Sequence, residues 1–381
     1  MEFELNEEQR MVRSMVRDLS QNEFAPRAAQ VDSTEAFPEE NIDRLAQLGL
    51  MGLPYPEAYG GGGGDYDSYA LAVEEIARGC GSTALVYAAH VSLGCGPIYA
   101  FGNEEQKQKW LPRLCSGQGL AAFGLTEPQA GSDAGATRTT AVRDGGDYVL
   151  NGSKMWITSG ALADVVNCTA KTDPEAGTKG ISCFLVEKGT PGFIPGKDEP
   201  KVGLKGSVTS ALALENCRVP ASTLLGEEGQ GFRQMLITLD SGRISIGAMA
   251  LGLGQAALDE ATRYAKERVQ FGQPIANFQA IQWMIADMAT EIDAARLMVY
   301  RAAAMKDAGL RFTKEAAMAK LYASEVAERV AFKAIQIHGG YGYSREYPVE
   351  RIYRDQRLCA IGEGTSEIQR LVIARQILGK L

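Results

Sequence analysis

The side chain best suited to chemistry is a glutamate near the end of the sequence, Glu363, which lies between Gly362 and Gly364. Neighbouring glycines carry no Cβ, so they leave the carboxylate accessible and permit a tight turn. A carboxylate held in this way can act as a general base, which takes a proton from a weakly acidic group. The alternative is a solvent-exposed glutamate at a helix start, and the motif alone does not separate the two.

The surroundings of Glu363 decide how strong a base it is. A helix is predicted directly after it, because Ser366 and Gln369 have the spacing of a capping box and apolar residues follow at helical intervals. Leu358, Ile361 and Ile368 predict an apolar pocket around it. Burial there raises the pKa of a carboxyl group, whereas a helix N-terminus lowers it. The sequence therefore leaves the net shift in the pKa of Glu363 open.

Composition excludes several other classes of function. The chain has 381 residues, of which 45% are apolar, and a net charge of −8 without a basic patch, which argues against nucleic acid as a partner. Seven cysteines without a CxxC pair and only two histidines predict no metal site and free thiols in the cytoplasm. No GxSxG motif of a serine hydrolase is present. We expect no membrane span and no secretory signal, because no run of about eighteen apolar residues occurs and the first residues are acidic.

Changes in periodicity predict an α+β fold with three domains, over residues 1–120, 121–228 and 229–381. The first is helical, the second alternates in short runs between turn residues, and the third has long amphipathic stretches typical of a helical bundle. Helices of the first domain are predicted over residues 39–50, 66–77, 82–101 and 104–114. The second domain should contain a β-hairpin at 139–150 and strands at 165–170, 181–186 and 211–214. The longest helices of the third are predicted at 278–305 and 312–337.

Two glycine-rich segments resemble nucleotide-binding motifs but lack their context. Residues 252–257 match the dinucleotide pattern GxGxxA, yet they lie inside a predicted helix with no strand before them, so we interpret these glycines as sites of close helix packing. Five glycines at 60–64 are not followed by the Lys-Ser/Thr pair of a P-loop and predict a flexible loop. His90 lies among small apolar residues and is interpreted as a core residue rather than a ligand.

Four further segments carry groups that suit a flat or phosphorylated ligand. Residues 125–133 supply hydroxyls and turn backbone, and Trp156 offers an indole close to the hydroxyl of Thr158. Residues 336–342 supply three glycines, which predict either a helix C-cap or a backbone surface for a nucleotide. The fourth segment is a turn that either binds a pyrophosphate or only connects two helices, and it is flanked by Arg268, Phe271 and Gln279.

In their order along the chain, these segments resemble the acyl-CoA dehydrogenases. The resemblance covers the whole length and rests on LTEPQAGSD at 125–133, WITSG at 156–160, RVQFGQPI at 268–275, QIHGGYGY at 336–343, EYPVERIYRD at 346–355 and EGTSEIQRLVIAR at 363–375. It implies an N-terminal α domain, a middle β domain and a C-terminal four-helix bundle, in agreement with the domains predicted from periodicity.

The resemblance also implies FAD as the cofactor, in a cleft between the β domain and the bundle. The isoalloxazine ring would contact Phe123, Leu125, Thr126, Gly131, Ser132, Trp156, Ile157, Thr158, Thr365, Ser366 and Glu367. The adenosine-diphosphate half would be held by Arg268, Phe271, Gln279, Gln336, Ile337, Gly339 and Gly340. Because the family is usually a homotetramer, this second set would serve the FAD of a neighbouring subunit.

A reaction and its base follow from the same resemblance. Glu363 matches the base that takes the α-proton of an acyl-CoA thioester, while flavin N5 accepts hydride from the β-carbon to give a trans-2-enoyl thioester. Some relatives carry the base on the helix matching residues 239–243, where this chain has Gly242, so Glu363 is the single candidate. The backbone N–H of Glu363 and a flavin ribityl hydroxyl would polarise the thioester carbonyl, and electrons would leave through an electron-transfer flavoprotein. Contacts to the CoA arm are implied for Ser132, Asp240, Arg243 and Gly364.

Two features bear on the acyl group. Gly362 stands where the family commonly has tyrosine or another large residue, which predicts room for a bulky, branched or cyclic chain. No arginine or lysine occurs between Gly79 and Gly96, where glutaryl-type enzymes carry an arginine, so a dicarboxylyl substrate is disfavoured. The alternatives that stay open are an acyl-CoA oxidase, an enoyl-CoA reductase or a desulfinase with the same cleft, and a non-catalytic scaffold that keeps the fold.

Overall fold

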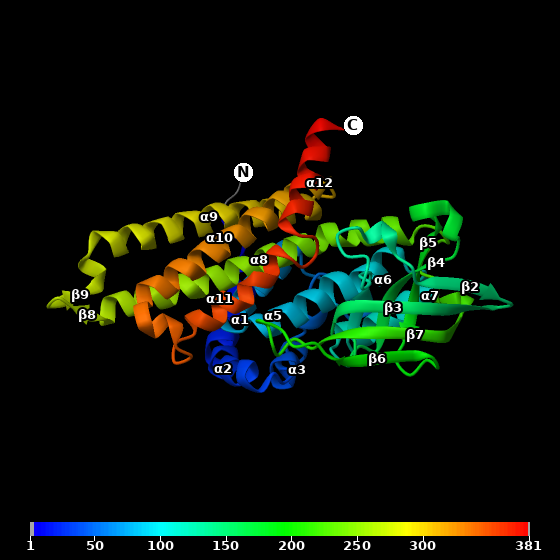
Figure 1. The fold of residues 1–381 in the computed structure, drawn as a ribbon, viewed down its shortest axis with the longest axis horizontal. Coiled ribbons are helices and arrows are strands. Elements are labelled where there is room, and N and C mark those ends of the chain that lie inside the picture. Colours follow the sequence, from blue (N-terminus) through cyan, green and yellow to red (C-terminus); the bar gives the residue numbers. More distant parts are fainter. Residues whose placement is uncertain (1–3, 380–381) are drawn as a thin grey trace.

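The computed structural model describes residues 4–379, which form a helical part, a β-sheet domain and a second helical part in this order along the chain (Figure 1). A helical N-terminal part is followed by a β-sheet domain at one end of the molecule. The long helices of the C-terminal part extend from this domain to the opposite end. The predicted α+β class, with a β domain between two helical regions, is therefore confirmed.

The N-terminal part consists of helices, some of which begin at side-chain caps that the sequence encodes. The helices are α1 (Glu7–Leu19), α2 (Ala25–Thr34), α3 (Glu39–Gln47), α4 (Tyr66–Gly79), α5 (Gly81–Ala88), α6 (Gly96–Phe101) and α7 (Glu104–Cys115). Asn6 and Gln9 form a capping box at α1, Asn103 and Gln106 form another at α7, and Asp65 caps α4. The helix predicted over residues 82–101 is helical throughout, but a π-helical turn at Ala89–Cys95 joins α5 to α6.

The sheet of the described chain contains β1 (Ala121–Gly124), β2 (Thr140–Asp144), β3 (Asp147–Thr158), β4 (Val165–Lys171), β5 (Ile181–Glu187), β6 (Phe193–Asp198) and β7 (Thr209–Pro220). Their order is β1-β4-β2-β3-β7-β6, with β5 paired to β4. The predicted hairpin is confirmed as β2–β3, closed by Gly145 at a φ of 63°, a conformation that favours glycine. The other predicted strands are confirmed as β4, β5 and the middle of the longer β7, whereas β1 and β6 were not predicted.

The C-terminal part is built on three long helices, α8 (Gly231–Glu267), α9 (Gln279–Asp307) and α10 (Thr313–His338). The predictions at 278–305 and 312–337 are thus confirmed. Between α8 and α9 a short hairpin of β8 (Val269–Gln270) and β9 (Gln273–Pro274) forms the end of the molecule farthest from the sheet (Figure 1). Two shorter helices, α11 (Val349–Asp355) and α12 (Ser366–Leu378), follow.

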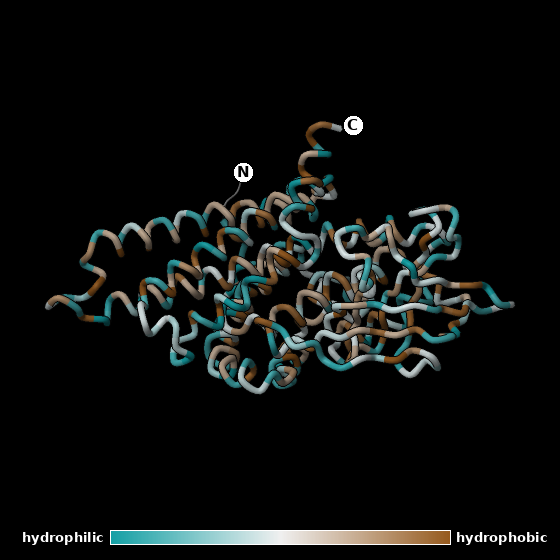
Figure 2. Tube along the Cα trace, in the orientation of Figure 1, coloured by the Kyte–Doolittle hydropathy of each residue, from teal (hydrophilic) through white to brown (hydrophobic). Residues whose placement is uncertain are grey.

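The two helical regions share one hydrophobic core, although they are separated by the β domain in sequence. This core joins residues of α4 such as Tyr69 and Val73 to residues of α8, α9 and α10 such as Met249 and Val299. Figure 2 shows apolar and hydrophilic segments alternating along the long helices, as expected when one face of each is buried. A second core lies within the sheet, around Leu150 and Phe184. The β domain therefore meets a single helical body rather than two separate ones.

By length and composition, two described helices are apolar enough to cross a membrane: the stretch Gly81–Phe101 and α8. This differs from the expectation that no such stretch occurs. Of their most apolar windows, 78% and 72% are buried inside the protein. Their apolar surface is thus already covered by other parts of the chain, as in the core helices of a folded domain.

The GxGxxA segment lies in the middle of α8, so its interpretation as a helix-packing site is confirmed. A Cβ at Gly252 would overlap the backbone oxygen of Glu74 and lie 2.7 Å from the Cβ of Ala77 on α4. At Gly254 an added Cβ would meet nothing closer than 3.7 Å, in the side chain of Ile292. Only the first glycine is required for the approach of α4 to α8.

This difference predicts opposite effects of the same substitution two residues apart. Gly252→Ala should lower the free energy of unfolding by about 1–3 kcal/mol, because α4 must move away from α8. Gly254→Ala should leave it unchanged or raise it by up to about 1 kcal/mol, because alanine is the better helix former. Urea unfolding of both variants measures the effect, and equal losses in the two would contradict the packing explanation.

Candidate active site

Glu363 lies on a turn whose backbone conformation is unusual for a side-chain-bearing residue. Its φ is 55°, in the left-handed region, and Gly364 follows at 95°. The turn is anchored by the N–H groups of Ile361 and Gly362, which both donate to the oxygen of Leu358 at 2.8 Å. A non-glycine residue in this region is strained and is frequently part of a functional site.

The helix predicted after the turn is confirmed as α12, but its predicted cap is wrong by one position. Thr365, not Ser366, is the N-cap, and its hydroxyl accepts a hydrogen bond from the N–H of Ile368 at 3.4 Å. Gln369 instead donates from Nε2 to the oxygen of Gly364 at 2.8 Å. The side-chain oxygen of Ser366 is buried and has no partner within the described chain.

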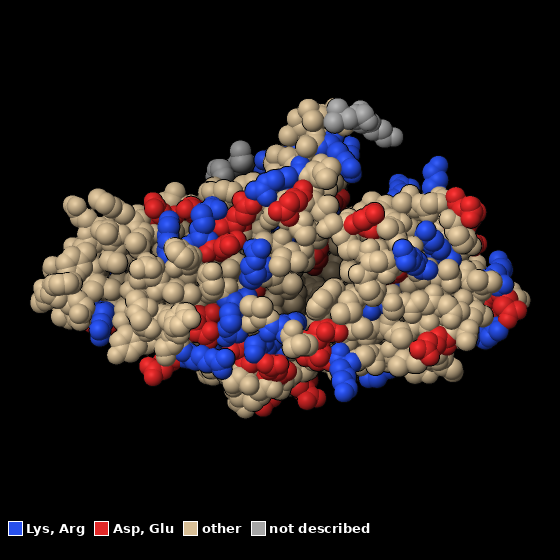
Figure 3. Space-filling view, viewed as in Figure 1, with Lys and Arg blue, Asp and Glu red and all other residues tan. Residues whose placement is uncertain are grey.

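The carboxylate of Glu363 packs directly against the backbone of Gly242 on α8. A Cβ at residue 242 would overlap Oε2 of Glu363 and would lie 3.0 Å from Cδ2 of Leu93. Oε2 is itself buried and has no hydrogen-bond partner among the described residues. Figure 3 shows a hollow between the helical body and the β domain, the region in which α8 and the sheet meet. The absent side chain at residue 242 therefore provides the space that the carboxylate occupies.

Burial raises the pKa of Glu363 to about 7, although two cations oppose it. These are Lys320 of α10, which donates to the oxygen of Gly364 at 2.7 Å, and Arg243 of α8, which pairs with Asp240 at 2.5 Å. The shift left open by the sequence is therefore upward. The alternative of a solvent-exposed glutamate is wrong, because the site holds a carboxylate whose pKa suits proton transfer near neutral pH.

The wall contributed by the β domain is fixed by a buried ion pair. Lys154 of β3 is fully buried and bonds Glu127 at 2.8 Å and Thr169 at 3.1 Å. Glu127 also accepts from the N–H of Arg138 at 2.6 Å, and the N–H of Met155 donates to the oxygen of Thr126 at 2.9 Å. Residues 125–133 are thus held against the end of β3.

Side chains predicted to contact a flat cofactor differ in exposure along this wall. Trp156 has a φ of 62° and is 55% exposed, so it is not a core tryptophan. Thr126 and Thr158 are half-buried, Phe123 is half-buried on β1, and Gly131 and Ser132 are exposed. Leu125 and Ile157 have buried side chains, so only their backbone can face a ligand. Of the turn at 365–367, Glu367 is exposed.

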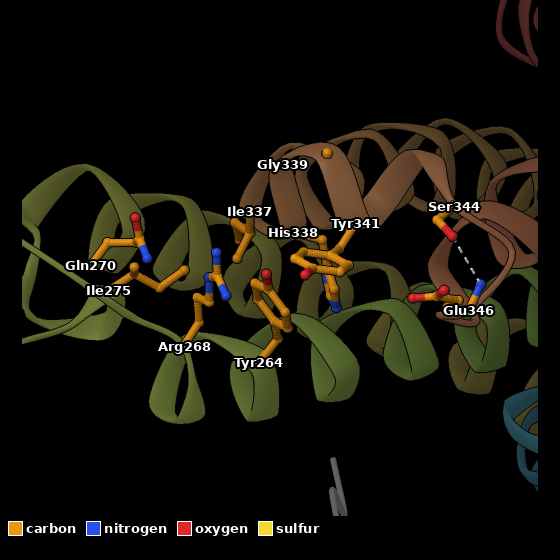
Figure 4. A pocket seen from close by; sticks show the side chains of 11 residues that line it. Tyr264, Arg268, Gln270, Ile275, Ile337, His338, Gly339, Tyr341, Ser344 and Glu346 are labelled. Carbon is orange, nitrogen blue, oxygen red and sulfur yellow. Dashed lines mark hydrogen bonds between the residues drawn. The ribbon is translucent and has the colours of Figure 1, made fainter.

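The remaining predicted cofactor residues lie at the opposite end of the bundle. Arg268, Ile337, Gly339 and Gly340 line a pocket of about 660 Å³ together with Tyr264, Gln270, Ile275, His338, Tyr341, Ser344 and Glu346 (Figure 4). The guanidinium of Arg268 lies 5.3 Å from the centre of the Tyr341 ring. Phe271, at the tip of the β8–β9 turn, is 93% exposed, and Gln279 and Gln336 are also exposed. Gly339, with a φ of 60°, ends α10 as the predicted C-cap.

Models of three protein domains match the chain along nearly its whole length. They are the acyl-CoA dehydrogenase N-terminal domain at residues 6–118, the middle domain at 122–217 and the C-terminal domain at 229–378. The chain belongs to the acyl-CoA dehydrogenase family. The resemblance of its motifs to this family is thereby confirmed.

Individual members of the family are similar over their full length. A probable acyl-CoA dehydrogenase of Bacillus subtilis is 58% identical over 99% of this chain and 100% of its own. Butyryl-CoA dehydrogenase of Megasphaera elsdenii has a TM-score of 0.97 and 46% identity, covering 99% and 100% of the two chains. A chain from a structure of the electron transferring flavoprotein of Acidaminococcus fermentans has a TM-score of 0.98 and 47% identity, with 100% of both chains covered.

Two buried lysines of this family member, Lys154 and Lys320, lie beside the site and were not predicted from the sequence. Lysine is ordinarily a surface residue, so neither was considered. A signal was present in each case. Lys154 follows Tyr148 and Leu150 at inward positions of β3, and Lys320 lies one helical turn from Ala316 in the buried stripe of α10.

Loss of one partner of the buried pair should destabilise the fold strongly. Lys154→Met should lower the free energy of unfolding by about 3–5 kcal/mol, because Glu127 is left buried without a counter-charge. The double variant Glu127→Gln/Lys154→Met, which removes both charges, should lose much less. Urea unfolding of the two variants at neutral pH measures the difference.

The same pair predicts a pH dependence. Burial alone would raise the pKa of Glu127, but Lys154 and the surrounding hydrogen bonds lower it to about 2, from an ordinary value of 4.5. A depressed pKa stabilises the folded state above pH 4.5, and the contribution is lost as the pH falls toward 2. The stability advantage of the wild type over the double variant should therefore shrink between about pH 5 and pH 3; a constant difference would contradict this.

Proposed function

We propose that this protein dehydrogenates an acyl-CoA thioester between its α- and β-carbons, with Glu363 as the base that removes the α-proton. The observation that carries the proposal is the carboxylate oxygen Oε2, which is buried against Gly242 without a hydrogen-bond partner in the described chain. A pKa of about 7 leaves a large fraction of Glu363 ionised at neutral pH while keeping it basic enough to take a proton.

The cofactor is FAD, on which this family depends. The residues of the site fit its ring system, because Trp156 offers an exposed indole face, Thr126 and Thr158 offer hydroxyls, and the buried oxygen of Ser366 lacks a partner among the described residues. When bound, FAD supplies the hydride acceptor for the β-carbon. The segments that would hold the ring are residues 123–132, 156–158 and 365–367.

The chain itself binds, orients and polarises the substrate. No hydrogen bond is formed by the backbone N–H groups of Glu363 and Gly364 within residues 4–379. The N–H of Glu363 is thus free to bond the thioester carbonyl, which stabilises the charge that develops as the α-proton leaves. Asp240 and Arg243, which pair with each other on either side of Gly242 on α8, and Ser132 on the exposed wall would contact the CoA arm.

The proposed assembly is a homotetramer in which FAD spans two subunits. One set of contact residues lies on the β domain and at the start of α12, and the other lies around the pocket at Arg268, at the end of the bundle far from the sheet (Figures 1 and 4). One cofactor cannot reach both, so the second set would serve the FAD of a neighbour. The exposed aromatic rings of Phe271 and Trp283, at 93% and 64%, support burial of this end against another copy.

The electron acceptor that we propose is an electron-transfer flavoprotein, in line with the similarity to the chain from Acidaminococcus fermentans. A cytoplasmic location is supported by the cysteines, all seven of which are free thiols buried in the core.

Removal of the base is the direct test of the proposed reaction. Glu363→Gln keeps the size of the side chain but cannot accept the α-proton, so flavin reduction by an acyl-CoA should slow by about 10²–10⁴-fold. In the wild type the rate should fall as the pH drops below about 7, because protonation removes the active carboxylate. Anaerobic stopped-flow bleaching of the flavin measures both, and a variant that reduces its flavin at the wild-type rate would refute the assignment.

Moving the base between the two facing positions gives a sharper control. Glu363→Gly should be inactive, whereas Glu363→Gly/Gly242→Glu should regain part of the activity, because a side chain at residue 242 enters the space that Glu363 vacates. The single variant Gly242→Glu should not bind substrate normally, since both carboxylates then compete for one site. Flavin bleaching of the three variants compares them, and a double variant no more active than Glu363→Gly alone would show that the two positions are not equivalent.

The acyl group that we propose is a short chain with room for a branch or a ring beside the base. A Cβ at Gly362 would make only ordinary contacts of 3.5 Å with Leu358, so a larger residue fits the backbone and would fill this space. Gly362→Tyr should therefore slow turnover of branched and cyclic acyl-CoAs more than that of straight ones. Relative kcat/KM over a panel of thioesters is the measurement, and equal losses for all of them would refute the proposal.

A further inference from the structure

A second charged residue of the site is buried without an opposite charge. Lys320, in the middle of α10, has no exposed surface, and its ammonium group donates to the backbone oxygen of Gly364 at 2.7 Å. Gln369 donates to the same oxygen at 2.8 Å. Two side chains from different helices thus hold the Gly364–Thr365 peptide, one residue after Glu363.

No carboxylate within residues 4–379 forms an ion pair with Lys320. A buried ammonium group without a counter-charge is costly, because it loses its hydration. Lys154, the other fully buried lysine noted above, is compensated by Glu127 at 2.8 Å. Among the carboxylates, Glu363 acts most strongly on Lys320.

The groups that face Glu363 come from every element packed around it. They are Lys320 of α10, Arg243 of α8, Tyr66 and Tyr69 of α4, and Cys359 in the turn before Glu363. Burial keeps the tyrosines and the cysteine neutral, since it raises the pKa of each. Arg243 shares its charge with Asp240 at 2.5 Å. Lys320 is therefore the cation whose field at Glu363 is least compensated.

We propose that Lys320 is a positioning residue of the reaction, which holds the catalytic turn through the oxygen of Gly364 and supplies the positive charge that keeps Glu363 ionised near neutral pH. The proposal rests on the proposed function of Glu363 as the base. In this proposal Lys320 transfers no proton. It affects the orientation and the charge state of Glu363.

Removal of the charge has a defined consequence for Glu363. A nearby positive charge typically lowers the pKa of a carboxyl group by about 1–3 units. Of the two cations that act on Glu363, Lys320 has the larger effect, so loss of its charge should raise the pKa of Glu363 by about one unit. Lys320→Gln retains a hydrogen-bond donor without the charge, and Lys320→Met removes both. Lys314→Met is the matched control, because Lys314 lies on the same helix, is partly exposed and pairs with Glu315 at 3.2 Å.

The protonation of Glu363 can be followed without turnover in the FAD-loaded protein. Carboxyl bands in the infrared spectrum that disappear in Glu363→Gln belong to Glu363, and their pH titration gives its midpoint. We expect the midpoint to rise by about one unit in Lys320→Gln and Lys320→Met and to stay unchanged in Lys314→Met. The acid limb of the flavin-reduction rate should move to higher pH by the same amount, whereas damage that is only structural would lower the rate equally at all pH values.

An unchanged or lower midpoint in Lys320→Gln would overturn the proposal, and this milder variant decides the matter if Lys320→Met does not fold. The outcome is separable from that of the proposed function. A wild-type protein that fails to reduce its flavin with any acyl-CoA would refute dehydrogenation, yet the infrared midpoint would still report whether Lys320 controls the charge of Glu363.

Discussion

The site depends on one steric constraint, which is that the carboxylate of Glu363 and a side chain at residue 242 cannot occupy the same space. Because residue 242 is glycine, the carboxylate can press against the backbone of α8 and lose its water. This loss of hydration raises the pKa of Glu363. The left-handed backbone conformation of Glu363, with a φ of 55°, accompanies the orientation of its side chain toward α8. The position of the carboxylate thus requires both Gly242 on α8 and the strained turn at Glu363.

This arrangement requires that α8 and the turn at 361–365 be held in fixed relation. The shared core of the two helical regions does this, since α4 reaches α8 closely only because Gly252 has no side chain. The β domain has a core of its own around Leu150 and Phe184, but residues of its other face, such as Val165 and Leu185, belong to the core of the helical body. Its wall at residues 125–133 is held from within the domain, by Lys154 and Glu127. The cleft is therefore formed by two surfaces that are joined through a shared core.

Most of the fold was predictable because its elements follow local rules. Asn103 with Gln106 and the Gly145 turn are signals that act within four residues, and the long helices are strongly periodic. β1 was missed because Ala-Ala-Phe-Gly has little strand propensity and pairs only with the distant β4, and β6 because it contains Pro195 and Gly196. The cap of α12 was misplaced by one residue because Thr365 and Ser366 carry the same hydroxyl, and backbone geometry alone selects between them.

For the site, residue identity was predictable and charge state was not. The glycines around Glu363 and the open place at residue 242 are visible in the sequence, but the pKa depends on burial and on cations brought in from other helices. The two buried lysines illustrate what sequence omits. Lys154 has a carboxylate beside it, and such a pair can exist for structural reasons alone. Among residues 4–379, the direct partner of Lys320 is the backbone oxygen of Gly364, and Glu363, the proposed base, also acts on it. Burial disfavours the charged form of Lys320, and no ion pair compensates for it within the described residues. A charged Lys320 therefore lowers the stability of the folded state, while its positive charge favours the ionised form of Glu363.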